Sequence, residues 1–210
     1  MTTTSTQFDA IVIGSGITGG WAAKELTEKG LKVLMLDRGR MVEHAKDYVG
    51  EHKPTWEVPF RGKPLRELYR EEYEVQSKLY AFDETTRHFF NNDKKNPYVY
   101  EPGGFLWHRG DVVGGKSLTW GRQVYRWSDL DFAANKKDGH GIDWPIRYKD
   151  IEPWYNYVEE FVGVSGQIEN LPQLPDSLFQ KPMAMNVVEQ HVKGKIESQG
   201  SVASFLSNDS

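Results

Sequence analysis

The stretch FDAIVIGSGITGGWAAKELTEKGLKVLMLDRGR, residues 8–40, decides the fold. Its first six residues are an apolar, β-branched run, which predicts a buried strand over 8–13. A glycine-rich turn follows at once. Apolar residues then recur at helical spacing, so a helix is expected over 17–29, with Gly30 as its C-terminal cap. The apolar run over 31–36 predicts a second strand, and the three pieces together make one βαβ unit with parallel strands.

The turn between the first strand and the helix has the pattern G-x-G-x-x-G, which is typical of loops that hold the diphosphate of a dinucleotide. The first glycine permits a tight turn, the second lets the backbone approach the pyrophosphate, and the third lets helix and strand pack closely. The anion then lies against the amides at the start of the helix. The residues expected at the diphosphate are Gly14, Ser15, Gly16, Ile17, Thr18 and Gly19.

An acidic residue closes the second strand at the place that a nucleotide would require. Asp37 follows Gly14 by 23 residues, near the spacing of about 20 found in dinucleotide-binding units. Its carboxylate is expected to hold the adenosine ribose and to repel the 2′-phosphate of NADP. Arg38 is expected beside the nucleotide. Arg38 and Arg40 keep NADP as an alternative, but a weaker one, because both are better explained as ordinary surface arginines. The βαβ unit alone does not distinguish FAD from NAD.

A second glycine-rich segment, RGDVVGGKSLTWGRQVYRW at 109–127, favours a flavin. Paired glycines allow a backbone to lie against a flat ring system, where amides and a hydroxyl can hydrogen-bond the flavin edge. A glycine hairpin with a core tryptophan is the alternative. The segment resembles the flavin-contacting loop of the glucose-methanol-choline oxidoreductases, most closely the branch with gluconate-type dehydrogenases and pyranose oxidase. On that resemblance the flavin contacts are Gly114, Gly115, Ser117, Thr119, Trp120 and Gly121.

The resemblance covers most of residues 8–192 and includes the segment IDWPIRYKDIEPWYNYVEEFVGVSG, 142–166. It implies an FAD-dependent oxidoreductase that acts on a CH–OH group of an alcohol or sugar, with hydride passing from the substrate carbon to flavin N5. Where the family attaches its flavin covalently through this loop, a histidine stands at the position of Thr119, so noncovalent FAD is expected. An electron-transfer subunit is implied as a partner.

No catalytic residue is assigned. The family places its catalytic base near the carboxyl end of much longer chains, and that catalytic half is expected to be missing here. None of the histidines matches the base or shows a metal-ligand spacing. His108, close to the flavin loop, is the one of most interest. The histidines are His44, His52, His88, His108, His140 and His191.

Two other functions compete with that of a flavin enzyme. An NAD dehydrogenase of the short-chain kind needs a Tyr-x-x-x-Lys pair, and no tyrosine in the chain has a lysine four residues later. A non-catalytic FAD- or nucleotide-binding fragment stays as the alternative, because the expected base is missing.

The expected fold class is α/β, an incomplete Rossmann-like FAD-binding domain over 8–192, with an α+β substrate domain absent or partial. A helical and loop excursion is expected at 43–106, because prolines and polar residues interrupt the pattern there. The serine-rich segment 193–210 is expected to be an unstructured tail.

Local signals predict further elements. Pro64 is expected to begin a helix that runs to Tyr80. The segment 98–107 is expected to form a hairpin that turns at Gly103 and Gly104. Asp150 is expected to cap a helix whose apolar positions run from Ile151 to Val162.

Composition narrows the functions. The net charge of −4 gives no reason to expect nucleic acid or an anionic membrane as a partner. The chain has no cysteine, so disulfides, thiolate metal sites and iron–sulfur ligation are excluded, and redox chemistry needs an organic cofactor. No metal site is expected. No run of about 18 apolar residues occurs, and no export signal is visible at 1–7, so a cytoplasmic protein is expected, with periplasmic export beside a partner subunit left open.

Overall fold

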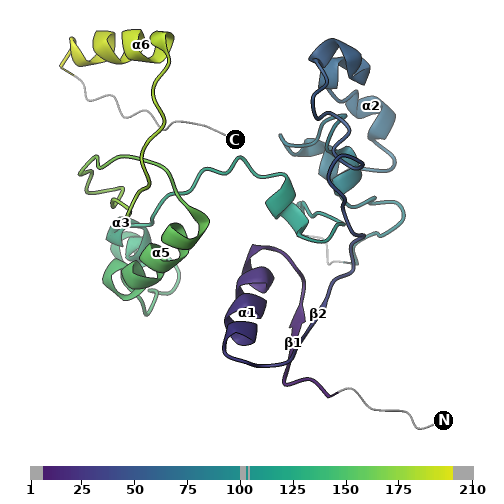
Figure 1. Cartoon of the computed structure of the whole chain (residues 1–210), viewed down its shortest axis with the longest axis horizontal. Helices are drawn as coiled ribbons and strands as arrows, with labels where there is room; N and C mark the ends of the chain where they lie inside the picture. Colours follow the sequence, from purple (N-terminus) through teal and green to yellow (C-terminus); the bar gives the residue numbers. More distant parts are fainter. Residues whose placement is uncertain (1–6, 100–102, 104, 201–210) are drawn as a thin grey trace. The chain divides into compact units, whose positions relative to one another are not determined.

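Two parallel strands with a helix between them open the chain (Figure 1). The strands are β1, Ala10–Ile13, and β2, Val33–Leu36, and the helix is α1, Ile17–Glu28. Pairing in register places Ile11 opposite Leu34. The predicted βαβ unit and its parallel pairing are therefore confirmed, and only these two strands form the sheet among the residues described.

This computed structural model describes residues 7–99, 103 and 105–200. The chain divides into two compact units, the first ending at Trp120 and the second beginning at Gly121. No helix within the described ranges is long and apolar enough to cross a membrane. The expectation that 8–192 belongs to one FAD-binding domain stays a prediction.

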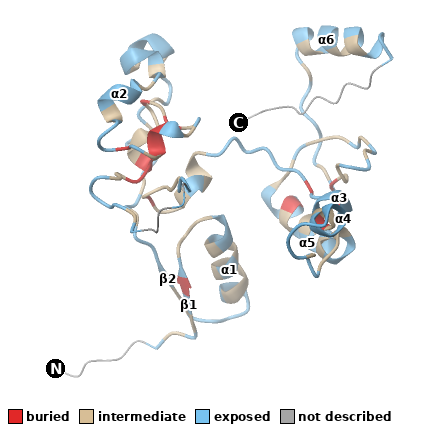
Figure 2. Ribbon diagram, turned by 180° about the vertical axis from the view of Figure 1, so that it is seen from behind, coloured by how far each residue is buried: buried red, intermediate tan, exposed pale blue. Residues whose placement is uncertain are grey.

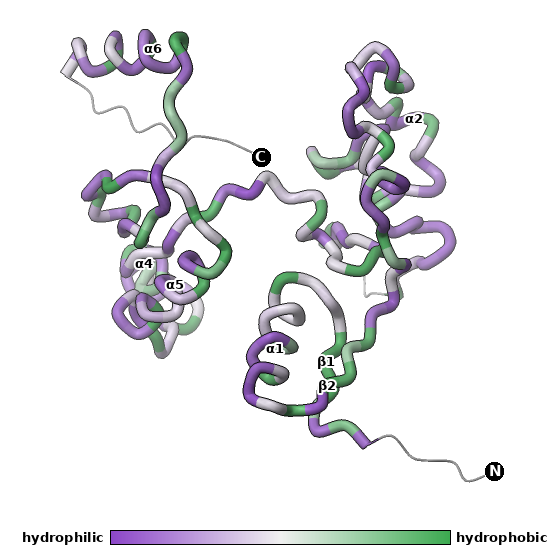
Figure 3. The backbone as a smooth tube through the Cα atoms, viewed as in Figure 1, coloured by the Kyte–Doolittle hydropathy of each residue, from purple (hydrophilic) through white to green (hydrophobic). Residues whose placement is uncertain are grey.

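Both strands consist of apolar residues, AIVI in β1 and VLML in β2, and Figure 3 draws them in green. Val12 is buried, and its side chain lies 3.5 Å from the position that a Cβ on Gly19 of α1 would take. Side chains alternate along a strand, so Ile11 and Ile13 point the other way, and they are 61% and 85% exposed. One face of the sheet thus packs on α1, while the opposite face presents apolar side chains to solvent.

The helix expected over 64–80 is wrong, because only one turn forms at α2, Arg66–Tyr69. In a continuous helix the amides of Val75 and Gln76 would bond to carbonyls four residues earlier. They donate instead to the carboxylate of Asp93, at 2.9 and 3.3 Å. The Asp93 amide in turn donates to the carbonyl of Glu72, at 2.7 Å. Asp93 therefore takes the place of the next helical turn.

The excursion contains the core of the first unit. Tyr73, Phe82 and Phe90 are buried against one another, and their rings lie 5.2 to 5.7 Å apart. Gln76 is fully buried, and its side chain accepts from the amide of Arg109 at 2.8 Å. Figure 2 shows buried segments, in red, close to α2. Segments expected to be an irregular excursion are thus joined by a small aromatic core.

The predicted hairpin at 98–107 falls partly outside the described residues, which omit 100–102 and 104. Its described flanks form no strand, although the rings of Tyr98 and Trp107 stack with centroids 5.6 Å apart. Backbone pairing occurs outside this segment, as an antiparallel bridge between Phe90, which precedes it, and Gly110, which follows it. The 3-10 helices of this unit are η1, Thr55–Glu57; η2, Pro59–Gly62; η3, Gln76–Lys78; η4, Arg87–Phe89; and η5, Gly115–Leu118.

The second unit is helical. Its elements are α3, Asp129–Phe132; α4, Ala134–Asp138; α5, Tyr148–Val162; and α6, Val187–Glu197. The expected helix after residue 147 is confirmed, but Asp150 lies in its first turn and accepts from the Arg147 amide at 2.8 Å. Residues 193–197 are helical, because Asn186 and Glu189 cap α6 reciprocally, so the expectation of an unstructured tail over 193–210 is wrong for these residues. Residues 201–210 of that segment lie outside the described residues.

A buried arginine organises this unit. The Arg126 side chain, only 2% exposed, donates to Glu159 at 2.5 and 2.9 Å and to Asn156 at 2.6 Å. Tyr148 accepts a further bond at 2.9 Å. All of these partners lie on α5, so the arginine fastens the preceding segment to that helix.

Candidate functional site

The G-x-G-x-x-G loop, residues 14–19 and called the fingerprint loop below, turns sharply between β1 and α1. Gly14 has φ +91°, a left-handed conformation that favours glycine, and its amide donates to the Leu36 carbonyl at 2.7 Å. A Cβ on Gly19 would lie 1.9 Å from the Gly14 carbonyl oxygen. The first and third glycines therefore have the steric roles expected from the pattern, one for the turn and one for the close approach of helix and strand.

The middle glycine faces open space. A Cβ built on Gly16 would meet no atom of the described residues within 4 Å. Gly16 is the N-cap of α1, no side chain of the described residues caps the helix, and its first turn holds no acidic residue. The unpaired amides and the positive end of the helix dipole at this end are thus left for an external anion.

Asp37 is tied to the fingerprint loop by Ser15. The Ser15 amide and hydroxyl both donate to one carboxylate oxygen, at 2.8 and 2.5 Å. The Gly39 amide donates to the other oxygen at 2.7 Å. The acid at the end of β2 is therefore brought to the mouth of the loop, as the spacing predicts.

These hydrogen bonds set the ionisation of Asp37. Partial burial raises the pKa of the carboxyl, but bonds from the Ser15 hydroxyl, the Gly39 amide and the Ser15 amide together lower it further. The pKa consequently lies below its usual range, and Asp37 is charged at neutral pH. A fixed negative charge at this position suits ribose hydroxyls and opposes a 2′-phosphate.

The second glycine segment lies directly against the first. The Gly114 amide donates to the Ser15 hydroxyl at 2.8 Å, although the two residues are 99 apart in sequence. A Cβ on Gly115 would lie 3.9 Å from the Cα of Gly16. Gly114 has φ +94°, so it also needs the freedom of glycine. The two motifs that were identified separately in the sequence therefore share one site.

Backbone pairing holds the two segments together. Arg40, just beyond β2, forms a parallel bridge with Val112, and the Val113 amide donates to the Arg40 carbonyl at 2.9 Å. A Cβ on Gly39 would lie 2.4 Å from the Val112 amide nitrogen. Gly39 and Val112 were not singled out in the sequence, because no local pattern reveals a pairing over so many residues.

The other predicted residues lie around this contact. The Ser117 hydroxyl donates to the Gly114 carbonyl at 2.6 Å and so stabilises the turn of η5. Arg38 forms an exposed ion pair with Asp111 at 3.6 Å. Ile17 and Thr18 are exposed in the first turn of α1.

Three predicted residues form no hydrogen bond with the fingerprint loop in the part of the chain that the structure describes. Thr119 bonds weakly to the Lys116 carbonyl at 3.4 Å. Trp120 is 39% exposed. Gly121 begins the second unit. Their role at a flavin stays a prediction.

The histidines near the site have structural partners. A ring nitrogen of His108 lies 3.1 Å from the Val75 carbonyl, and one of His88 lies 2.6 Å from the Asp47 carbonyl. Within the described ranges, no three histidine or acidic residues gather as metal ligands would.

Several known dehydrogenases are similar in sequence to this chain. No family profile matches the chain. It is 29% identical over 180 residues to the 2-methyl-1,2-propanediol dehydrogenase of Mycolicibacterium austroafricanum, covering 84% of this chain and 28% of that protein. It is 27% identical to the fructose dehydrogenase large subunit of Gluconobacter japonicus, over 75% of this chain and 27% of that protein. It is 26% identical to the gluconate 2-dehydrogenase flavoprotein of Pantoea cypripedii, over 75% of this chain and 25% of that protein.

The chain spans about a quarter of the length of these curated relatives. The aligned region nevertheless covers three quarters or more of the chain itself. The chain is thus a distant relative of the flavoprotein dehydrogenases and oxidases of the glucose-methanol-choline family.

Proposed function

We propose that this chain binds FAD noncovalently where the two glycine loops meet, as part of a Rossmann-like FAD-binding domain. One observation carries the proposal: Ser15 joins Asp37 to Gly114, which brings the fingerprint loop, the ribose-binding acid and the second glycine segment together. A glycine-rich turn alone could hold many anions. A second glycine backbone beside it adds a surface that suits a flat ring system.

The residues present fit this cofactor. The open space beyond Gly16 leaves room for a pyrophosphate, and an added methyl group there would occupy it. Asp37 would accept from the ribose hydroxyls. Gly114, Gly115 and Ser117 would lie toward the flavin. FAD, when bound, supplies a hydride acceptor at flavin N5.

We further propose that the reaction is oxidation of a CH–OH group in an alcohol or sugar. The names of the relatives support this class, since one is a diol dehydrogenase and another a fructose dehydrogenase. The fructose dehydrogenase relative is by name a large subunit, which supports an electron-transfer subunit as a partner. The chain's own contribution is to bind and orient the cofactor. We assign removal of the hydroxyl proton to none of its residues.

Flavin titration of the purified chain tests the proposal. Flavin fluorescence should change saturably as FAD is bound, while NAD and NADP should bind much more weakly. Ser15→Ala removes the hydroxyl that joins the loops and should weaken FAD binding, whereas Ser198→Ala, which removes a hydroxyl in the second unit, should not. A colourless protein that prefers NAD would refute the assignment.

Activity is tested separately. An alcohol or sugar is added anaerobically to the FAD-loaded chain, and loss of the flavin's visible absorption is followed. We expect no bleaching, because no catalytic base is assigned within the chain. Bleaching would instead show that the chain itself supplies the base, and would exclude the alternative of a non-catalytic flavin-binding fragment.

A further inference from the structure

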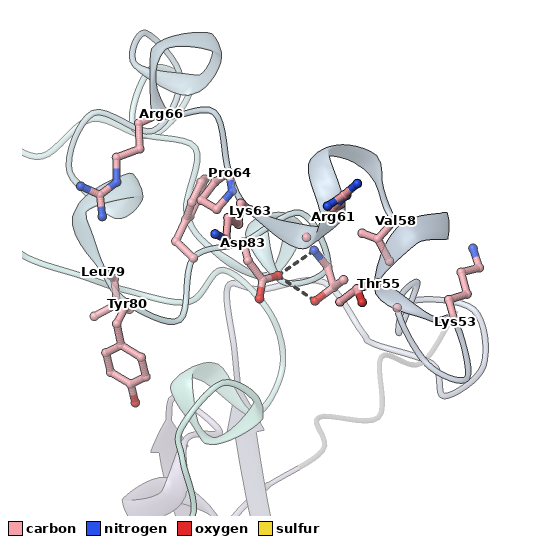
Figure 4. Close-up of a pocket in the computed structure, with 14 residues that line it drawn as sticks. Lys53, Thr55, Val58, Arg61, Lys63, Pro64, Arg66, Leu79, Tyr80 and Asp83 are labelled. Carbon is pink, nitrogen blue, oxygen red and sulfur yellow. Dashed lines mark hydrogen bonds between the residues drawn. The ribbon is translucent and has the colours of Figure 1, made fainter.

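A cavity lies in the first unit, within the segment 43–106 that was expected to be an excursion. It has a volume of about 500 Å³ and is bounded by η1, η2 and the residues that follow them (Figure 4). That volume is within the range of roughly 300–1,000 Å³ of small-molecule sites. None of its lining residues belongs to the candidate flavin site.

The lining is strongly basic. Four of the lining side chains are cationic, namely Lys53, Arg61, Lys63 and Arg66. All four are exposed, and none forms an ion pair with another residue in the described part of the chain. This basic row contrasts with the net charge of −4 of the whole protein. Figure 4 shows Lys53 and Arg66 at opposite ends of the lining, with Arg61 and Lys63 between them.

The acid in the lining, Asp83, has one oxygen engaged by the turn that follows it. One oxygen of Asp83 accepts from the amide and hydroxyl of Thr85, both at 2.7 Å, and from the amide of Thr86 at 3.0 Å. That oxygen of Asp83 therefore serves the turn, and among the described residues Asp83 forms no ion pair with any of the four cations. The wall beside it is apolar, since Leu79 and Phe82 belong to or pack on the aromatic core.

The backbone at the centre of the basic row is strained. Phe60 and Arg61 have φ +55° with left-handed geometry, and Gly62 follows with φ +80°. Side chains other than glycine rarely adopt this region, and such outliers gather at ligand sites, where the surroundings enforce them. The turn is fixed to the core by the Glu84 amide, which donates to the Gly62 carbonyl at 3.2 Å. An arginine thus stands where glycine would relieve the strain.

We propose that this cavity binds a small organic anion that carries two or more carboxylate or phosphate groups. The extended row of four cations requires several negative groups, and a single carboxylate would engage only part of it. Guanidinium and ammonium groups form charge-assisted hydrogen bonds with both kinds of oxyanion. The apolar wall at Leu79 and Phe82 accommodates the carbon skeleton.

Calorimetric titration of the full chain with citrate, inorganic triphosphate and acetate tests this site. Citrate and triphosphate should bind saturably at one site, and acetate at least about tenfold more weakly. Preference for citrate identifies a polycarboxylate, and preference for triphosphate a phosphate ester. Binding should also weaken in about 1 M salt, where the screening length falls to about 3 Å. Absence of saturable binding by both polyanions would overturn the proposal.

Matched charge variants locate the binding. Arg61→Gln with Lys63→Gln should weaken citrate or triphosphate binding at least about tenfold, and Lys53→Gln with Arg66→Gln provides a second pair if the first destabilises the turn. Lys136→Gln with Lys137→Gln removes the same charge from exposed positions of α4 and should change affinity less than about threefold. An equal loss in this control would overturn a localised site.

Two further outcomes would also overturn the assignment. Tighter binding of a poly-glutamate peptide than of either small polyanion would indicate an acidic protein partner instead. Competition by saturating FAD would show that the cavity is not a site of its own. Circular dichroism of every variant ensures that a loss of binding is not a loss of folding.

Discussion

Replacing Gly16 with alanine separates binding from folding at the candidate flavin site. The backbone at Gly16 has φ −64° and ψ −176°, which any residue adopts without strain, and the added Cβ would meet no described atom within 4 Å. The free energy of unfolding should therefore change by less than about 1 kcal/mol, the scale of a change at an N-cap. The same methyl group would occupy the space proposed for the pyrophosphate.

The expected loss of FAD affinity follows from overpacking. Forcing an extra methyl group into a close contact costs about 1–3 kcal/mol, which corresponds to a decrease in affinity of about 5- to 150-fold. Flavin fluorescence titration measures the dissociation constant, and urea denaturation measures the stability of the same preparations. Both measurements are needed, because only a large loss of affinity at nearly constant stability supports the proposed contact.

Gly20→Ala provides the matched control. Its Cβ also meets no described atom within 4 Å, but Gly20 lies inside α1, on its exposed surface. Alanine there should stabilise the helix by up to about 1 kcal/mol and leave FAD affinity unchanged. If Gly16→Ala bound FAD within about threefold of the unaltered chain, the diphosphate could not lie over this glycine, and the reasoning would be refuted.

Three further substitutions test other contacts. Gly19→Ala should lower the free energy of unfolding by about 1–3 kcal/mol, because its methyl group would lie 1.9 Å from a backbone oxygen; an unchanged urea midpoint would contradict that close approach. Asp37→Asn should lower stability at neutral pH, and the difference from the unaltered chain should shrink as pH falls below about 4, because a carboxyl with a lowered pKa contributes only while it is charged; urea unfolding at a series of pH values would reveal a constant difference if this is wrong. Glu159→Gln removes the carboxylate partner of the buried Arg126 and should cost about 3–5 kcal/mol, whereas Glu160→Gln, at an exposed position, should cost under about 0.5 kcal/mol; tryptophan fluorescence during unfolding compares the two variants, and equal effects would refute a buried ion pair.

The βαβ unit could be predicted because its signals are local. The apolar runs, the glycine spacing and the helical periodicity all lie within residues 8–40, and each agrees with the others. The position of Asp37 followed from the same spacing. The hydrogen bond between Ser15 and Gly114 could not be predicted, because it joins residues 99 apart and no pattern in either segment encodes the other.

Two expectations failed for different physical reasons. The helix after Pro64 stopped early because Asp93, distant in sequence, captured the amides of Val75 and Gln76, and a local periodicity cannot reveal such a competitor. The helix α6 was overlooked although its signal was local, since Asn186 followed three residues later by Glu189 is a capping box. The prediction was instead based on the serine-rich composition of residues 193–210, which is typical of an unstructured segment.

The exposed isoleucines of β1 have a practical consequence for every experiment on this chain. The short parallel sheet exposes Ile11 and Ile13 to water, and this apolar surface can associate with other unfolded or partly folded chains. The protein should therefore aggregate at high concentration, before a ligand titration reaches saturation. The substitution Ile13→Lys would place a charge on this exposed strand and reduce aggregation during titrations.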